Sequence, residues 1–454
     1  MRMTKRRKLE KSGRRLGRAG DFLNLTEAER NDIEIKQTLA HVHRHFVTQK
    51  RLAVQLILVL ATICCRCDNP IQAAILQTGS GREFSTIQSA VNAALPGDII
   101  KVWPLSAGKA YRCVAILVRK PRLTIEAAQP GQYVKINGNR LNYSGRGRIA
   151  RAIFQFNPSA SGCILRGFEL TGAHNRSCNG AGVRINAANH VTIQNCYIHN
   201  NDMGIMSNGS LARGTGADQI IERCRITRNG SWLQAGYNHN LYLGGTSVLV
   251  RGCDISHSLT GHDLKSRAHI TDVEYCYIHD SANRELDLVD KRGNTDAPQS
   301  NALVLGCLIV KKNAITGNHE VINFGRDGKA NHSGTLYLVH DTIRTPYPTA
   351  VVTLSAAGAR LVLLDNNFVT SQHRATLIIA RNGGRMDNIR GTGNIFATAY
   401  QPVARRFEGP MLHWRKIVLP WAALGLKPAR LMRYNRSGQV VPWPHSTAGA
   451  GTSQ

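Results

Sequence analysis

Val191-Thr-Ile-Gln-Asn-Cys-Tyr-Ile-His-Asn-Asn201 contains the pattern apolar-x-x-Cys-x-apolar, and this pattern recurs along the chain. Alternate residues of the segment are apolar, which predicts two short strands that meet at a corner and bury one side. Close copies occupy residues 219–229, 247–256, 272–279 and 302–309, and weaker copies occupy residues 165–170, 336–343 and 361–368. Units that can bury their apolar side only against the next unit are typical of a solenoid.

Five cysteines fall at the same position of successive copies, namely Cys196, Cys224, Cys253, Cys276 and Cys307. Their separations vary from 23 to 31 residues, which indicates a constant rung and loops of variable length. In a stacked solenoid these side chains would form an internal ladder with neighbours about 4.8 Å apart. No C-x-x-C spacing occurs among them, so we interpret them as buried thiols that fill space rather than as metal ligands or disulfides.

A second, shorter strand precedes the copies, and its alternate residues are also apolar. These predicted strands cover residues 182–186, 204–208, 240–244, 263–267, 285–289, 321–324, 351–354 and 376–379. The alternation places pairs such as Leu241 with Leu243 inside the solenoid and the intervening side chains on one outward face.

Residues 84–102 predict a helix before the first coil. Ser85 or Thr86 can cap a short helix with an apolar side of Ile87, Val91 and Leu95, and the following Pro-Gly-Asp turn leads into a strand. A solenoid needs such a cover over its open apolar end.

This opening, with Tyr111, Ile116 and residues 123–125 and 136–138 after it, resembles the start of the pectate-lyase-like superfamily of right-handed parallel β-helix proteins. The resemblance covers about residues 78–400. It implies an all-β, right-handed parallel β-helix solenoid with a short N-terminal capping helix. Lyases, hydrolases, epimerases and tailspike adhesins share that fold, so the resemblance does not fix a reaction.

Polar side chains concentrate on adjacent rungs of the outward face. We predict that one column on this face consists of Tyr242, Lys265, Asp287 and Asn323. The further polar residues on the same rungs or on earlier rungs are Arg184, Asn240, Asp263, Arg267 and Glu285. The loops 209–217, 231–238 and 291–300 would flank this face. Trp232 and Tyr237, in the second of these loops, either stack on sugar rings or pack locally.

The chemistry that suits these residues is β-elimination from a uronic-acid polymer, which needs a base and positive charge near the substrate carboxylate. Lys265 is the predicted base, because the neighbouring Arg267 would lower its pKa. Tyr242, His239 and His262 are further candidates for proton transfer, although corner histidines also often bond loop carbonyls. The predicted substrate-binding residues are Asn240, Asn323, Arg184 and Trp232.

Asp263, Glu285 and Asp287 could hold Ca²⁺, a hard cation that prefers carboxylate oxygens. The resemblance agrees, since Lys or Arg bases with acidic Ca²⁺ ligands are typical of the lyases of the superfamily. In its alginate- and chondroitin-cleaving branch, however, the Lys and Arg come from different rungs, whereas here both lie on one predicted strand. The resemblance therefore implies the same kind of chemistry, but the catalytic motif of that branch is not matched in this sequence.

Three alternatives remain open at this point. Asp263, Glu285 and Asp287 could supply the carboxylate pair of a glycoside hydrolase. The protein could be a non-catalytic glycan binder of the cell envelope, or the charges could form a salt-bridged surface without further role. No recognised nucleic-acid-binding motif occurs, so no specific nucleic-acid partner is expected.

The chain of 454 residues is strongly basic, with 58 Lys and Arg, 29 Asp and Glu, and a net charge of +29. Such a charge favours an acidic polysaccharide as partner. A basic tail (1–51) precedes an apolar segment (52–65) with the length of a signal-peptide core, which predicts export to the periplasm, cell envelope or exterior, or a membrane tether. We expect residues 401–454 to cover the C-terminal end and finish in a disordered tail, and the protein to be a monomer.

Overall fold

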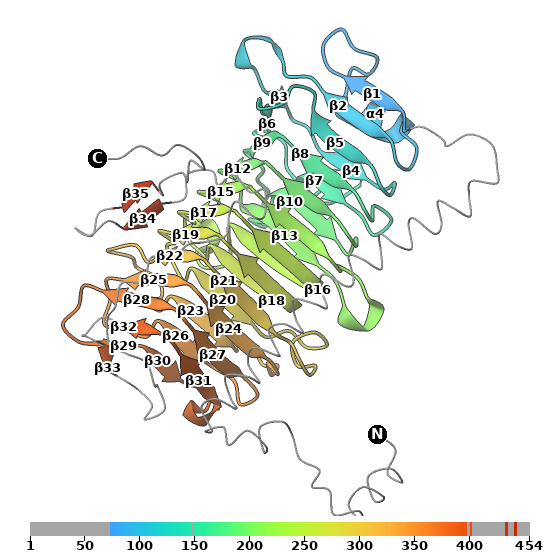
Figure 1. Cartoon of the computed structure of the whole chain (residues 1–454). Coiled ribbons are helices and arrows are strands. Elements are labelled where there is room, and N and C mark those ends of the chain that lie inside the picture. The colour runs from blue at the N-terminus through green and yellow to red at the C-terminus, as the bar shows by residue number, and fades with distance from the viewer. Residues whose placement is uncertain (1–72, 148, 397–399, 402–431, 435–439, 443–454) are drawn as a thin grey trace, which may run out of the picture. The chain divides into compact units, whose positions relative to one another are not determined.

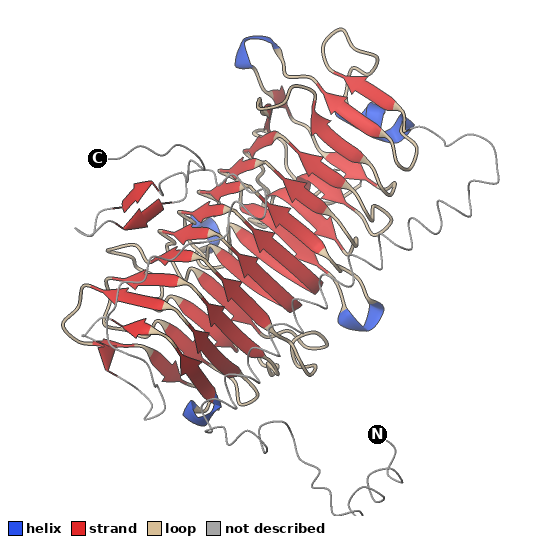
Figure 2. Cartoon of the chain, in the orientation of Figure 1, coloured by secondary structure: helices blue, strands red, loops and turns tan. Residues whose placement is uncertain are grey.

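The strands form a coil in which each turn passes through three stacks of parallel strands (Figure 1, Figure 2). This computed structural model describes residues 73–147, 149–396, 400–401, 432–434 and 440–442. The predicted basic tail, the apolar segment and most of residues 401–454 lie outside the described residues. Each strand pairs in register with the equivalent strand one turn earlier and one turn later, so the described coil is a parallel β-helix.

The first stack carries the polar face predicted from the sequence. Its members are β4 (Ile116–Val118), β7 (Ala152–Phe156), β10 (Ala181–Asn186), β13 (Met203–Asn208), the first halves of β16 (Leu241–Arg251) and β18 (Leu264–Glu274), β20 (Leu286–Val289), β23 (Ile322–Gly325), β26 (Val352–Leu354) and β30 (Ile378–Ala380).

The second stack follows after one corner, and β16 and β18 run through that corner without a break. Its members are β1 (Ile75–Thr78), β2 (Ile99–Val102), β5 (Thr124–Ala127), β8 (Ile164–Arg166), β11 (Thr192–Gln194), β14 (Gln219–Glu222), the second halves of β16 and β18, β21 (Ala302–Leu305), β24 (Thr335–Val339), β27 (Arg360–Leu364) and β31 (Ile389–Thr392).

The third stack completes each turn. Its members are β3 (Tyr111–Arg112), β6 (Val134–Asn137), β9 (Phe168–Thr171), β12 (Tyr197–His199), β15 (Arg225–Thr227), β17 (Asp254–Ser256), β19 (Tyr277–His279), β22 (Leu308–Val310), β25 (Thr342–Thr345), β28 (Asn367–Thr370) and β32 (Ile395–Phe396). The remaining described strands form two separate two-stranded sheets. One pairs β29 (Ala375–Thr376) with β33 (Tyr400–Gln401), and the other is antiparallel and pairs β34 (Met432–Tyr434) with β35 (Val440–Pro442).

The interior is a column of aliphatic side chains in matching register. Leu241, Leu264, Leu286 and Ile322 stack directly on successive rungs, and none is exposed. Each such burial contributes roughly 1.5–3 kcal/mol of hydrophobic stabilisation. The five repeat cysteines are buried, as predicted, and the structure forms no disulfide between them.

The helix α4 (Ile87–Ala93) lies where residues 84–102 predict one. The side chain of Thr86 accepts a hydrogen bond from the backbone N–H of Ser89, and Ile87 and Val91 are buried. Leu95 was expected on the same apolar side, but it follows the end of the helix and is 64% exposed. Among the described residues, no helix has the length and apolarity needed to cross a bilayer.

Candidate functional site

The predicted polar column is present in the first stack. Tyr242 pairs with Lys265, Lys265 with Asp287, and Asp287 with Asn323, each on the next rung. The column continues toward the N-terminus through Met206 to Arg184. Because one side chain per rung emerges at about 4.8 Å intervals, these groups are placed within contact distance of their neighbours.

Asp287 is the centre of a buried charge network. Its Oδ2 lies 2.7 Å from Nζ of Lys265 and 3.3 Å from Nε2 of His262, and its Oδ1 lies 3.4 Å from Nη1 of Arg284. Asn323 Nδ2 donates to Oδ1 at 3.0 Å. Burial would raise the pKa of Asp287, but His262, Lys265 and Arg284 hold it well below its usual range. Asp287 is therefore an ionised carboxylate that organises the site, and Asn323, also buried, serves it as a donor.

Lys265 and Arg267 together hold a second carboxylate, that of Asp327. Lys265 Nζ contacts Oδ2 of Asp327, and Arg267 Nη2 lies 2.6 Å from Oδ1. The loop that carries Asp327 is fixed by Asp290, whose carboxylate accepts backbone N–H groups of Asp327, Gly328 and Ala330, all at 2.8 Å. The two cations thus form a clamp for both oxygens of one carboxylate, which we call the carboxylate clamp.

The clamp overturns one prediction about Lys265. Burial would lower its pKa, but Asp287 and Asp327 outweigh burial and raise it above the ordinary value. The expectation that Arg267 activates Lys265 as a neutral base is therefore wrong. The physical reason is that two carboxylates, one of them from a loop, lie closer to the ammonium group than the sequence could show.

The two candidate histidines stack at the corner before the first stack, with ring centroids 5.1 Å apart. His262 Nδ1 accepts the backbone N–H of Arg284, so the proton of the neutral ring is on Nε2, which faces Asp287. Burial lowers the pKa of His262 to about 4. Both ring nitrogens of His262 therefore have partners in this structure, the backbone N–H of Arg284 and the carboxylate of Asp287.

His239 is held in the same way, since its Nδ1 accepts the backbone N–H of His262 at 3.0 Å. Burial, assisted by His262, lowers the pKa of His239 well below its ordinary value. Its ring lies 5.3 Å from that of Tyr242. Tyr242 is half-buried and packs on Met206 and Met203. Burial would lower the pKa of Arg267, but Tyr242 and Asp327 raise it, which places the guanidinium beside the phenolic oxygen.

Asn240, Asp263 and Glu285 are fully buried, so their prediction as outward residues is wrong. They precede the first core residue of each strand, where the chain still turns through the corner and alternation does not apply. Asn240 Nδ2 donates to Asp263 Oδ1 at 2.8 Å and extends a ladder of buried amides. Asn240 is thus a structural residue, not a substrate contact.

A lysine from the next rung balances the buried acids. Lys311 Nζ lies 3.1 Å from Glu285 Oε2. Burial raises the pKa of Asp263 well above its usual range and that of Glu285 to about 7. Asp263 and Glu285 thus face Lys311, while Asp287 faces other cations, and the three carboxylates do not converge on one point. Calcium binding stays a prediction that a chelator experiment addresses.

The remaining predicted residues lie at the borders of the face. Trp232 is 74% exposed on the loop before β16, so it does not pack locally. Arg184 is half-buried on β10. On the other side, Lys291 Nζ donates to the carbonyl of Gly209, so the loops 209–217 and 291–300 contact each other as one border.

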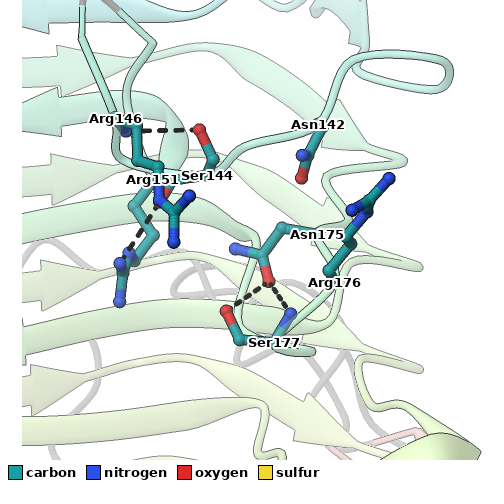
Figure 3. Close-up of a pocket in the computed structure, with 7 residues that line it drawn as sticks. All are labelled: Asn142, Ser144, Arg146, Arg151, Asn175, Arg176 and Ser177. Carbon is teal, nitrogen blue, oxygen red and sulfur yellow. Dashed lines mark hydrogen bonds between the residues drawn. The ribbon is translucent and has the colours of Figure 1, made fainter.

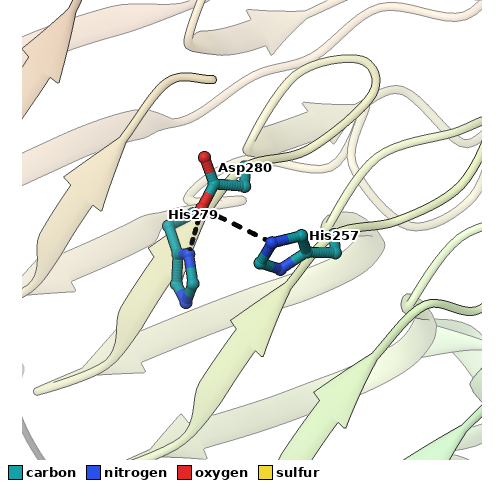
Figure 4. A group of neighbouring side chains, drawn as sticks. All are labelled: His257, His279 and Asp280. Atoms are coloured by element: carbon teal, nitrogen blue, oxygen red, sulfur yellow. Dashed lines mark hydrogen bonds and ion pairs between the residues drawn. The ribbon is translucent and has the colours of Figure 1, made fainter. Parts of the chain in front are cut away.

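A second cluster of titratable groups lies at the carboxyl ends of β17 and β19 in the third stack (Figure 4). His257, His279 and Asp280 offer ligand atoms within 4.8 Å of one another. Burial would lower the pKa of His279, but Asp254 and Asp280 outweigh it and raise the pKa to about 9. This histidine is therefore a cation held between two carboxylates, at 3.3 Å and 2.7 Å.

The family described as "Right handed beta helix region" matches residues 128–343. Among solved structures, a polygalacturonase from Erwinia carotovora ssp. carotovora is similar, with a TM-score of 0.50, 10% identity, and coverage of 75% of this chain and 98% of that chain. The chain therefore has the fold of a right-handed parallel β-helix.

Two further β-helix structures are less similar. Pectate lyase Pel9A has a TM-score of 0.43 at 10% identity, covering 75% of this chain and 80% of that chain. A tailspike protein gp49 from Acinetobacter baumannii bacteriophage Fri1, a capsular polysaccharide depolymerase, has a TM-score of 0.46 at 10% identity, covering 81% and 66%. No curated protein matches the sequence.

Three functional groups of this β-helix were missed from the sequence, namely Arg284, Asp327 and Lys311. Arg284 shares its corner position with His239 and His262, so the register signal that identified the histidines could also have found it. Lys311 lies two residues beyond the predicted copy 302–309 of its rung. Asp327 follows a strand that ends in Gly325, and no periodic signal places it over Lys265.

Proposed function

We propose that the protein is a carbohydrate-active enzyme, a polysaccharide lyase that cleaves an anionic, uronic-acid-containing glycan by β-elimination. The observation that carries this proposal is the carboxylate clamp, in which Lys265 and Arg267 hold both oxygens of Asp327. A substrate carboxylate that displaces Asp327 would gain the same two charge-assisted contacts. Elimination requires this neutralisation, because negative charge spreads onto the carboxylate when the adjacent C5 proton leaves.

Tyr242 is the proposed proton-transfer group. It lies one rung from Lys265 in the same column, so a sugar held by the clamp would lie within reach of its hydroxyl. The step starts from the phenolate form of Tyr242: its oxygen takes the C5 proton, the C4–O bond breaks with formation of the C4=C5 double bond, and the same proton passes to the leaving oxygen, which restores the phenolate. Arg267 stabilises the phenolate that takes the C5 proton, and His239 fixes the position of the ring.

The name of a protein that shares the fold and the net charge of this chain both support the proposal. The polygalacturonase that shares the fold is named for a uronic-acid polymer. The net charge of +29 attracts such polyanions. The exposed Trp232 and Tyr237 stand at the border of the same face and offer flat apolar surfaces to sugar rings.

A glycoside hydrolase is the second candidate. Asp287 and Asp327 both contact Nζ of Lys265, which places two carboxylates on either side of one ammonium group. Inverting and retaining hydrolysis both use a pair of carboxyl groups. Because the carboxylate of Asp287 stays ionised, it could act as a base or nucleophile but not as a proton donor. Asp327 would therefore have to be the acid.

The two candidates are separated by incubation with alginate, polygalacturonate and glycosaminoglycans. A lyase produces the ultraviolet absorbance of a 4,5-unsaturated uronate, whereas a hydrolase produces reducing ends without it. Each substrate is tested with added Ca²⁺ and with a chelator, which checks the predicted calcium dependence. If Lys265→Ala weakens retention on these polymers and wild type releases no product, the protein is a non-catalytic binder.

Export is part of the same proposal, because polymeric glycans lie outside the membrane. Lys50 and Arg51 before the apolar segment 52–65 support export or a membrane tether. Fractionation of cells that express the full chain tests this, and recovery of all the protein in the cytosol would contradict it.

A further inference from the structure

A polar cavity of about 310 Å³ lies on the loops that lead from the third stack into β7 and β10. Figure 3 shows Arg146, Arg151 and Arg176 around it, with Asn142, Asn175 and Ser177. The two loops are tied together, since Asn142 pairs with His174 and Asn175 Nδ2 donates to the carbonyl of Tyr143 at 2.7 Å. The cavity is thus built by two packed loops of adjacent rungs.

The charge of this cavity is not balanced by carboxylates. Within the described part of the chain, Arg146, Arg151 and Arg176 make no ion pair, whereas Arg267 and Arg284 on the same side of the coil are both paired. Arg184 on β10 lies close behind, and its pKa is lowered by burial and by Arg151. A neighbouring carboxylate, Asp202, is buried and already accepts the backbone N–H groups of Asn175 and Gly180.

A loop that lines the cavity is bonded to the loop that borders the candidate site. Asn238 Nδ2 donates to the carbonyl of Cys178, which attaches the loop carrying Trp232 and Tyr237 to the loop of Arg176. His239 follows directly on that loop. Arg184 and Tyr242 belong to one column, two rungs apart, which corresponds to about 10 Å along the coil.

We propose that the arginine cavity binds an oxyanion of the polysaccharide, a carboxylate or a sulfate ester, on a sugar several residues away from the one in the carboxylate clamp. This inference rests on the proposed function, because it places one anionic polymer along both sites. Guanidinium groups suit planar or tetrahedral oxyanions through paired N–H donors. The sugar rings between the two sites would pass the exposed faces of Trp232 and Tyr237.

The test compares two double variants of equal charge change. Arg146→Ala/Arg176→Ala removes two exposed cavity arginines, and Arg119→Ala/Arg374→Ala removes two exposed arginines elsewhere on the coil. Calorimetric titration with galacturonate oligomers of increasing length measures Kd. We expect the cavity variant to bind long oligomers at least about tenfold more weakly, the shortest oligomers unchanged, and the control variant to match wild type. Equal Kd values for both variants would overturn the inference.

Further ligands identify the source of the oxyanion. Dextran sulfate and single-stranded DNA are titrated in parallel. A cavity-specific loss with galacturonate alone assigns a carboxylate, and a loss also with dextran sulfate assigns the oxyanion in general. Equal losses for both variants with all three polymers would show non-specific charge attraction and refute the site.

Failure of this inference is distinguishable from failure of the proposed function. If the cavity variant loses affinity but no polymer is cleaved by wild type, the binding site stands and the lyase does not. If wild type releases unsaturated products and both double variants have the same KM for long polymers, the lyase stands and the cavity site does not.

Discussion

Lys311 Nζ lies 3.1 Å from Oε2 of Glu285, and neither side chain has any exposed surface. This pair closes the corner next to the candidate site, and Asp263 lies beside it. We predict that Lys311→Met destabilises the protein by about 3–5 kcal/mol, because it removes the cation that pairs with the buried Glu285. Urea unfolding followed by fluorescence measures the loss.

Lys312→Met is the matched control, since Lys312 is exposed and adjacent in sequence. We expect it to change stability by less than about 0.5 kcal/mol. The double variant Lys311→Met/Glu285→Gln should recover part of the loss. A Lys311→Met protein as stable as the control would show that the buried pair does not bear on stability.

Stability should also fall between neutral and alkaline pH because of His279. Its pKa is about 9 in the folded protein and about 6.5 in an unfolded chain. A raised pKa gives a contribution that is complete below pH 6.5 and is lost as the pH rises through 9. The expected size is on the order of 2–3 kcal/mol.

His279→Gln should remove this part of the pH profile, and His373→Gln, at an exposed position, should not. The free energy of unfolding is measured from pH 6 to pH 10 for all three proteins. Identical slopes for wild type and His279→Gln would argue against the ion pairs of His279 with Asp254 and Asp280.

Asp327 competes with a substrate carboxylate for the clamp. We therefore predict that Asp327→Ala lowers KM for a cleaved uronate polymer about three- to tenfold, since a partly exposed ion pair is worth about 1 kcal/mol. Steady-state kinetics measure the change, with the exposed Asp387→Ala as control. A higher KM in Asp327→Ala would mean that Asp327 helps to bind the substrate.

Tyr242→Phe should reduce kcat about 10²- to 10⁴-fold, the usual contribution of a general acid–base group. Phenylalanine keeps the packing on Met206 and removes only the hydroxyl. Oligosaccharide affinity should stay within about twofold of wild type, because Lys265 and Arg267 are untouched. If Tyr242→Phe has the same kcat as wild type, another group must transfer the proton.

The sequence could predict which site residues share a column, because every turn of the coil repeats the same pattern of core residues. Once Leu241, Leu264 and Leu286 are aligned as core residues, Tyr242, Lys265 and Asp287 must share a column. Alternation failed one residue earlier, at Asn240, Asp263 and Glu285. There the chain turns through a corner, and side chains that period-two counting assigns to the surface are enclosed by hydrogen-bonded neighbours.

The partners that set the charges were less predictable, because they come from loops. Asp327 reaches Lys265 from a segment 62 residues later in the chain. That contact depends on how Asp290 orders backbone N–H groups of the loop, which residue spacing does not encode. Because residue spacing did not reveal this loop contact, Lys265 was predicted as a base with a lowered pKa, whereas in the structure it is a cation paired with carboxylates.

The most direct test of the account is mass spectrometry of the products formed from a uronate polymer in oxygen-labelled water. Elimination should give oligosaccharides with an unsaturated end, lighter by one water than hydrolysis products, and without labelled oxygen. Products that carry one labelled oxygen and no double bond would contradict the lyase and establish hydrolysis at this site.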